Sequence, residues 1–138
     1  MVVNRHIQLR TQGNGHVLDI TEQVRREVTQ SRLQDGIVTL FTPSSTSALT
    51  TLEYESGAIY DLQHLFDRMI PPDADYRHNL RWGDGNGHSH LRSALLGPSL
   101  TVPFVKQQLT LGTWQQIIFV DFDNRARSRS IVVQIIGE

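Results

Sequence analysis

Three of the six histidines in this chain, His78, His88 and His90, lie in one short segment on either side of a glycine-rich loop. A His-x-His pair with a third imidazole nearby can supply three neutral nitrogen ligands to a zinc-like ion and leave one position open for water or substrate. We therefore predict that the three rings converge on one metal-binding pocket. The alternative is that the imidazoles only hydrogen-bond the backbone of the loop.

The glycine-rich loop itself contains Gly85, Asn86 and Gly87, and a helix is predicted to follow over residues 87–96. The free backbone N–H groups and the positive dipole end at a helix start attract anions, and glycines let a ligand approach the backbone closely. A phosphate-binding site is therefore predicted beside the metal. The loop lacks the Lys-Ser/Thr ending of a P-loop, so the alternative of a simple tight turn stays open.

Arginines at a two-residue spacing, Arg125, Arg127 and Arg129, follow two aspartates near the C-terminus, Asp121 and Asp123. This spacing places the three guanidinium groups on one face of a strand. Such a cluster can bind phosphate or the carboxylates of a neighbouring subunit. A solvated edge with local Asp–Arg pairs is an equally good interpretation of the pattern.

Two further carboxylates are candidates for general acid/base or metal-orienting roles. Glu53 ends a β-rich segment, and Asp61 lies early in the helix expected after it. Both are also explained as ordinary surface charges. The hydroxyls of Ser44, Ser45 and Thr46 have no base beside them in the sequence, so a serine nucleophile is not predicted.

Hydropathy and turn signals predict one α+β domain over residues 1–138, with mixed or antiparallel sheets packed with about three helices. A hairpin of residues 3–11 and 17–20 is expected to come first, and Thr21 is expected to cap the next helix. Helices are expected over residues 21–32, 57–70 and 87–96, and further strands over 37–41, 47–53, 100–105, 109–111, 114–121 and 130–136.

Composition limits the function classes. A net charge of −1 over 138 residues gives no general attraction to nucleic acid or to an anionic membrane, so neither partner is expected. The absence of cysteine excludes disulfides and thiolate chemistry. No apolar run has the length of a transmembrane helix, and the N-terminus lacks the pattern of a signal peptide, so a cytoplasmic protein is expected.

Long motifs cover nearly the whole chain. They are the segment 41–53, the isolated His78, the segment 85–99 and the shorter runs 102–103, 109–117 and 137–138. With these motifs the chain resembles the YjbQ-like family, also called the secondary thiamine-phosphate synthase family. The resemblance implies a compact α+β subunit that assembles as a homotrimer and has a histidine pocket able to hold a divalent metal.

The resemblance also implies an activity. In the reaction for which the family is named, hydroxymethylpyrimidine diphosphate joins thiazole phosphate and releases pyrophosphate, and the physiological substrate can be a different phosphorylated small molecule. The family's histidines map onto His78, His88 and His90, its glutamate onto Glu53 and an acidic position onto Asp61. Many members have His-Thr where this chain has Ser44-Ser45, and proline where it has Ala126.

The expected ligand contacts are those of Gly85, Asn86, Gly87, Ser99, Arg125 and Arg127. The three-histidine set favours zinc, whereas a diphosphate substrate favours magnesium held by carboxylates. A metal-dependent hydrolase of a phosphorylated molecule and a non-catalytic metal-binding assembly module are the alternative functions. If His88 serves a ligand and not the core, His88→Ala should leave the fold intact.

Overall fold

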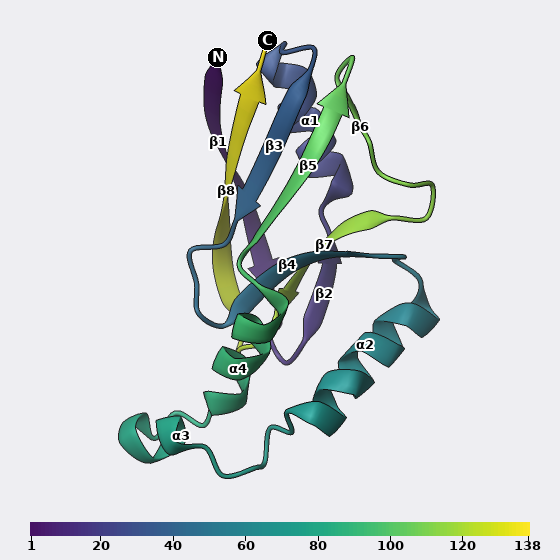
Figure 1. Cartoon of the computed structure of the whole chain (residues 1–138). Coiled ribbons are helices and arrows are strands. Elements are labelled where there is room, and N and C mark those ends of the chain that lie inside the picture. Colours follow the sequence, from purple (N-terminus) through teal and green to yellow (C-terminus); the bar gives the residue numbers. More distant parts are fainter.

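Alternating apolar residues build the two longest strands, which lie side by side although they stand at opposite ends of the sequence. The computed structural model describes all 138 residues. Strand β1 (Val2–Thr11) pairs antiparallel with β8 (Arg127–Gly137) along its whole length, from Val2 opposite Ile136 to Thr11 opposite Arg127. Figure 1 shows both termini at the same end of this pair.

Eight strands form two antiparallel sheets. The five-stranded sheet has the order β1-β8-β3-β5-β6, and the three-stranded sheet has the order β2-β7-β4. The remaining strands are β2 (His16–Asp19), β3 (Gly36–Phe41), β4 (Ser47–Leu52), β5 (Ser99–Val105), β6 (Gln108–Leu109) and β7 (Gln116–Asp121). Every pairing is antiparallel, which selects one of the two predicted sheet types.

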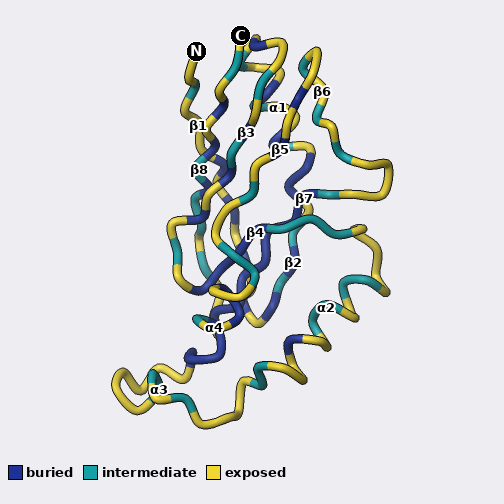
Figure 2. Tube along the Cα trace, viewed as in Figure 1, coloured by how far each residue is buried: buried dark blue, intermediate teal, exposed yellow.

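Helix α1 (Thr21–Ser31) packs Val24 and Val28 into the main apolar core, which also takes the inward side chains of the five-stranded sheet and of β7. A smaller core under α2 (Ser56–Met69) contains Phe66, Val120 and Phe122. Helices α3 (Arg77–Trp82) and α4 (Gly87–Leu96) complete the chain's four helices. Figure 2 shows that α2 and α3 are mostly exposed, in contrast to β7, which is mostly buried.

Three local predictions were wrong. The first two strands do not form a hairpin, because β1 pairs with β8 and β2 pairs with β7. Helix α3 was not expected; its six residues give too little periodicity to detect. Thr21 is the first helical residue and not the cap: its backbone N–H donates to the Asp19 carboxylate at 2.9 Å.

No helix in the structure combines the length and the apolar character that crossing a membrane requires.

Candidate functional site

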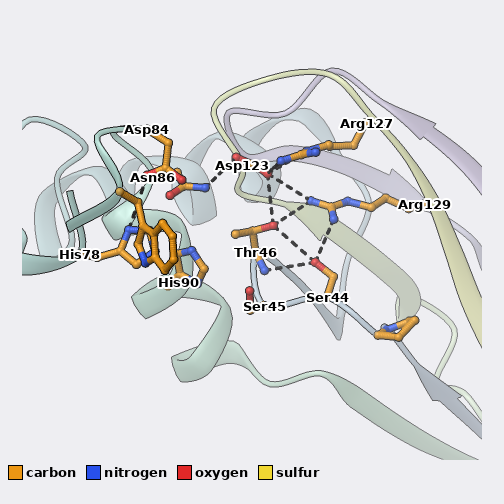
Figure 3. A pocket seen from close by; sticks show the side chains of 12 residues that line it. Ser44, Ser45, Thr46, His78, Asp84, Asn86, His90, Asp123, Arg127 and Arg129 are labelled. Atoms are coloured by element: carbon orange, nitrogen blue, oxygen red, sulfur yellow. Dashed lines mark hydrogen bonds and ion pairs between the residues drawn. The ribbon is translucent and has the colours of Figure 1, made fainter. Parts of the chain in front are cut away.

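A polar cavity of about 480 Å³ opens where the β3–β4 loop faces α3, the start of α4 and the chain between β7 and β8 (Figure 3). It brings together residues from four separate parts of the sequence. Twelve residues line it: Pro43, Ser44, Ser45, Thr46, His78, Trp82, Asp84, Asn86, His90, Asp123, Arg127 and Arg129.

Two of the predicted histidines meet in this cavity. His78 comes from α3 and His90 from the first turns of α4, and their ring centroids are 4.2 Å apart. His78 Nδ1 lies 3.7 Å from the Asp84 carboxylate, too far for a hydrogen bond. Burial is the main cause that lowers the pKa of His90 below its ordinary value of 6.5, and the electrostatic effect of the neighbouring His78 adds to it. His90 is therefore a neutral imidazole near pH 7.

The third histidine does not join them. His88 is only 4% exposed, its ring lies 6.5 Å from that of Tyr76, and its Nδ1 has no hydrogen-bond partner. Burial, followed by the charge of Arg92, lowers its pKa. The prediction that the three rings converge was wrong within a single chain. His88 and His90 are two residues apart on a helix, so their side chains point in directions about 200° apart around the helix axis. No three histidine, aspartate or glutamate side chains are grouped to hold a metal ion.

One wall of the cavity is a hydroxyl-bearing loop held by a buried ion pair. Arg129 Nε and Nη2 donate to the Asp121 carboxylate at 2.8 and 2.9 Å, and Thr11 donates to the same carboxylate at 2.6 Å. The guanidinium also donates through Nη1 to Ser44 Oγ and through Nη2 to Thr46 Oγ1, each at 2.9 Å. The Asp121–Arg129 pair thus fixes the loop against the sheets.

A second ion pair, in which the arginine is more exposed, lines the same cavity. Arg127 contacts Asp123 through Nε at 2.9 Å and through Nη2 at 2.7 Å. Burial alone would raise the pKa of Asp123, but hydrogen bonds from Arg127, the Asn124 N–H and the Asn86 side chain outweigh it and lower the pKa below 3.8. The ionised carboxylate accepts the Asn86 Nδ2 donor at 3.3 Å. Arg127 Nη1 makes no hydrogen bond within the chain.

Side chains of Tyr76 and Asn79 pack against Gly87 at the start of α4. The Gly87 N–H donates to the Asn79 side chain at 2.8 Å, and a Cβ at Gly87 would lie 2.6 Å from Tyr76 Cβ. Gly87 is therefore needed for close packing against Tyr76, and its N–H already has a partner within the chain, whereas phosphate binding at this loop stays a prediction. Gly85 is exposed with a φ of +69°, a conformation that favours glycine in the loop.

The other predicted site residues lie outside the main cavity. Arg125 lines an adjoining cavity of about 220 Å³, which shares Asn86, Asp123 and Arg127 with the main one. Glu53 is exposed just after β4, Asp61 is exposed on α2, and Ser99 is exposed at the start of β5. The structure of one chain does not bring these three residues to the histidines.

Sequence reasoning placed Arg129 in the arginine cluster but did not include Arg129, Ser44 or Thr46 among the expected ligand contacts. The two-residue spacing of the arginines was a usable signal for Arg129, since it puts Arg129 on the same face as Arg127. For the hydroxyls no signal existed, because the guanidinium that orients them is distant in the sequence.

Comparisons with known proteins agree over almost the full length. Residues 5–138 match the model of the family described as UPF0047 protein YjbQ-like. A UPF0047 protein of Methanothermobacter thermautotrophicus is 38% identical over 99% of this chain and 94% of its own length. One from Archaeoglobus fulgidus is 38% identical over 93% and 97%.

Solved structures are also similar to this chain over nearly its full length. A YbjQ-like protein of unknown function from Sulfolobus solfataricus matches with a TM-score of 0.90 and 31% identity over 100% of both chains. A hypothetical protein from Aeropyrum pernix matches with a TM-score of 0.92 and 29% identity over 99% of both.

Proposed function

The chain belongs to the UPF0047 YjbQ-like family, and on that premise we propose that its polar cavity binds a phosphorylated small molecule and acts on it. The observation that carries the proposal is the meeting of two histidines, a guanidinium and a hydroxyl-bearing loop in one cavity. Its volume of about 480 Å³ suits a small ligand. Only one of its twelve lining residues is hydrophobic, which favours a ligand rich in charged oxygens.

These side chains can stabilise negative charge on a phosphorylated substrate and transfer protons. Asp123 binds Nε and Nη2 of Arg127 and holds the guanidinium in place. Nη1 is left free, so it can donate to a phosphoryl oxygen from a fixed position. His90 is neutral near pH 7 and lies beside His78, so the pair can exchange a proton with a leaving or entering group. No nucleophilic side chain is required.

Secondary thiamine-phosphate synthase activity is the specific reaction that we propose for this site. The thiazole nitrogen forms a bond to the methylene carbon of hydroxymethylpyrimidine diphosphate while the bond from that carbon to the diphosphate oxygen breaks. The electron pair leaves with pyrophosphate, whose charge Arg127 stabilises. The physiological substrate in this proposal is any small phosphate ester or diphosphate that fits the cavity.

A metal ion has no assigned step in this proposal, because the residues of one chain do not fit a three-histidine zinc site. His88 Nδ1 is buried away from the pair formed by His78 and His90. Zinc, or magnesium with a diphosphate, stays a prediction from the family resemblance, and elemental analysis of the purified protein tests it.

A hydrolase is the second candidate, favoured by the position of Asp84 beside His78. A carboxylate 3.7 Å from an imidazole can orient it as a general base toward water with a small movement. Release of phosphate from a phosphorylated substrate without any acceptor molecule would distinguish this hydrolase from the transferase.

Ligand binding is the first experiment. Pyrophosphate should raise the melting temperature by mass action, and Arg127→Gln should weaken its affinity by about 1.5–3 kcal/mol, the range for hydrogen bonds to charged groups. Arg26→Gln is the matched control, because Arg26 is an exposed arginine on α1, outside the cavity. If no phosphorylated ligand shifts the melting curve, the non-catalytic assembly module becomes the better explanation of the fold.

A further inference from the structure

We infer that Ser44 and Ser45 form the oxyanion subsite of this cavity, and that the Ser44 hydroxyl acts there only as a hydrogen-bond donor to the ligand. The inference rests on the proposed function and locates the phosphoryl group within the cavity. It places that group at the β3–β4 loop and not at the start of α4, where the Gly87 N–H is already bound by Asn79.

The hydrogen bonds of Ser44 leave one direction open. A hydroxyl has two acceptor positions and one hydrogen to donate. Ser44 Oγ already accepts from Arg129 Nη1 at 2.9 Å and from the Thr46 N–H at 3.1 Å, so both acceptor positions are filled. The internal acceptor recorded for its hydrogen is Thr46 Oγ1 at 3.4 Å, well beyond the usual O–H···O distance. The hydrogen is therefore available to a ligand acceptor.

Arg129 enforces this state and cannot serve the ligand itself. Its side chain is only 13% exposed, and the fully buried Asp121 holds it in a two-point contact. Swinging the guanidinium toward a ligand would leave the Asp121 carboxylate buried and unpaired, at a cost of several kcal/mol. Arg129 is thus a positioning residue, whose donation to Ser44 increases the polarity of that hydroxyl.

The neighbours of the loop agree with an anionic ligand at this point. Ser45 is exposed, and its hydroxyl has no hydrogen-bond partner within the chain. Both serines also line an adjoining cavity of about 230 Å³, which His90 shares. A phosphoryl group at the serines therefore lies in reach of His90, and Arg127 lines the same main cavity. Figure 3 shows the serines and His90 around the same space.

Calorimetric titration of pyrophosphate into the full chain tests the subsite. Ser44→Ala should weaken binding about tenfold or more, because a donor to a charged oxygen is lost. Ser44→Thr keeps the hydroxyl and should restore most of the affinity. Ser56→Ala is the matched control: Ser56 is an exposed serine at the start of α2, outside the cavity lining, and its loss should leave the affinity unchanged.

The outcomes separate this inference from the proposed function. Equal affinity of the wild type and Ser44→Ala, with weaker binding by Arg127→Gln, would overturn the subsite and leave the cavity as the binding site. Equal losses in Ser44→Ala and Ser44→Thr would overturn it as well, since the hydroxyl would then not be the cause. A wild-type protein that binds no pyrophosphate would overturn both proposals.

Discussion

His88 and His90 show how helix geometry divides side chains that look like one motif. The two residues are separated by one position in α4, and one imidazole faces the cavity while the other is buried beside Tyr76. In a strand the same spacing would have placed both rings on one face. The role of each histidine is therefore decided by the element that carries it, and His88 belongs to the packing of the α3–α4 region.

Replacing His88 should cost stability. His88→Ala removes a ring that is only 4% exposed, and we expect the free energy of unfolding to fall by about 2 kcal/mol, as for other buried side chains. This reverses the expectation from sequence that the fold would be indifferent to the change. Urea denaturation followed by circular dichroism measures it, with the partly exposed His78→Ala as the control. Equal stability of the two variants would contradict the structural role of His88.

Asp123 gives the protein a specific sensitivity to acid. Its pKa in the folded state lies below the ordinary 3.8, so its ionised form stabilises the fold fully above that pH. The stabilisation is lost as the pH falls below about 4 toward the folded-state pKa, because the unfolded chain binds the proton first. Asp123→Asn should therefore flatten the dependence of unfolding free energy on pH in this range. An unchanged slope would show that other carboxylates dominate acid unfolding.

At the scale of elements, the Asp121–Arg129 pair joins the two sheets. Asp121 ends β7 of the three-stranded sheet, and Arg129 lies in β8 of the five-stranded sheet. Both oxygens of the Asp121 carboxylate accept hydrogen bonds, from the Arg129 guanidinium, from the Thr11 hydroxyl and from the Asp123 N–H. The pair therefore fixes the distance between the sheets at the same point where it positions the hydroxyl loop.

Breaking this pair should be costly. We expect Asp121→Ala to lower the free energy of unfolding by about 3–5 kcal/mol, because it leaves a buried guanidinium without its counter-charge. The double variant Asp121→Ala with Arg129→Met should recover part of the loss. Glu22→Gln, which removes the exposed Arg25–Glu22 pair, should cost less than about 1 kcal/mol. A double variant as unstable as the sum of its single variants would show that the two side chains act independently.

Local periodicity was enough to predict most elements but not their partners. The helix over 87–96 matches α4, and the strand over 37–41 lies within β3 (Gly36–Phe41). The pairing of β1 with β8 could not be inferred, since a two-residue period shows which face of a strand is buried and not which strand lies beside it.

The sequence likewise indicated which residue types could form the cavity but not which side chains contact one another there. His78, His90, Asn86 and Arg127 were identified by residue type, and all four line it. The orientation of Ser44 could not be inferred, because it depends on Arg129, which a different part of the chain carries.

For the whole molecule, the outer face of the five-stranded sheet has no covering layer. Apolar side chains on this face are exposed, among them Ile37, Phe41, Val105 and Ile136. Ile37 and Ile136 are cross-strand partners on β3 and β8, so their side chains are neighbours near the end of the sheet that carries the chain termini. Exposed apolar patches on a small protein commonly mark sites of association.

We expect the chain to assemble as a homotrimer, as the family resemblance implies, and the exposed sheet face gives it apolar surface to bury. Light scattering coupled to size exclusion should give three times the chain mass of 15.7 kDa. Ile37→Glu should shift the mass toward the monomer if this face is used, whereas Tyr60→Glu, on the exposed side of α2, is the control. A monomer mass for the wild type at micromolar concentration would contradict the assembly.

The place of β8 between β1 and β3 has a consequence for how the protein is made. As a ribosome releases the chain from its N-terminus, β1 emerges first, yet its partner β8 is the last strand to follow. Until then the nascent β1 has an unpaired edge, and the five-stranded sheet lacks the strand that joins β1 to β3. Completion of this sheet therefore has to wait for the synthesis of β8, and until then the exposed strand edges can pair with other chains.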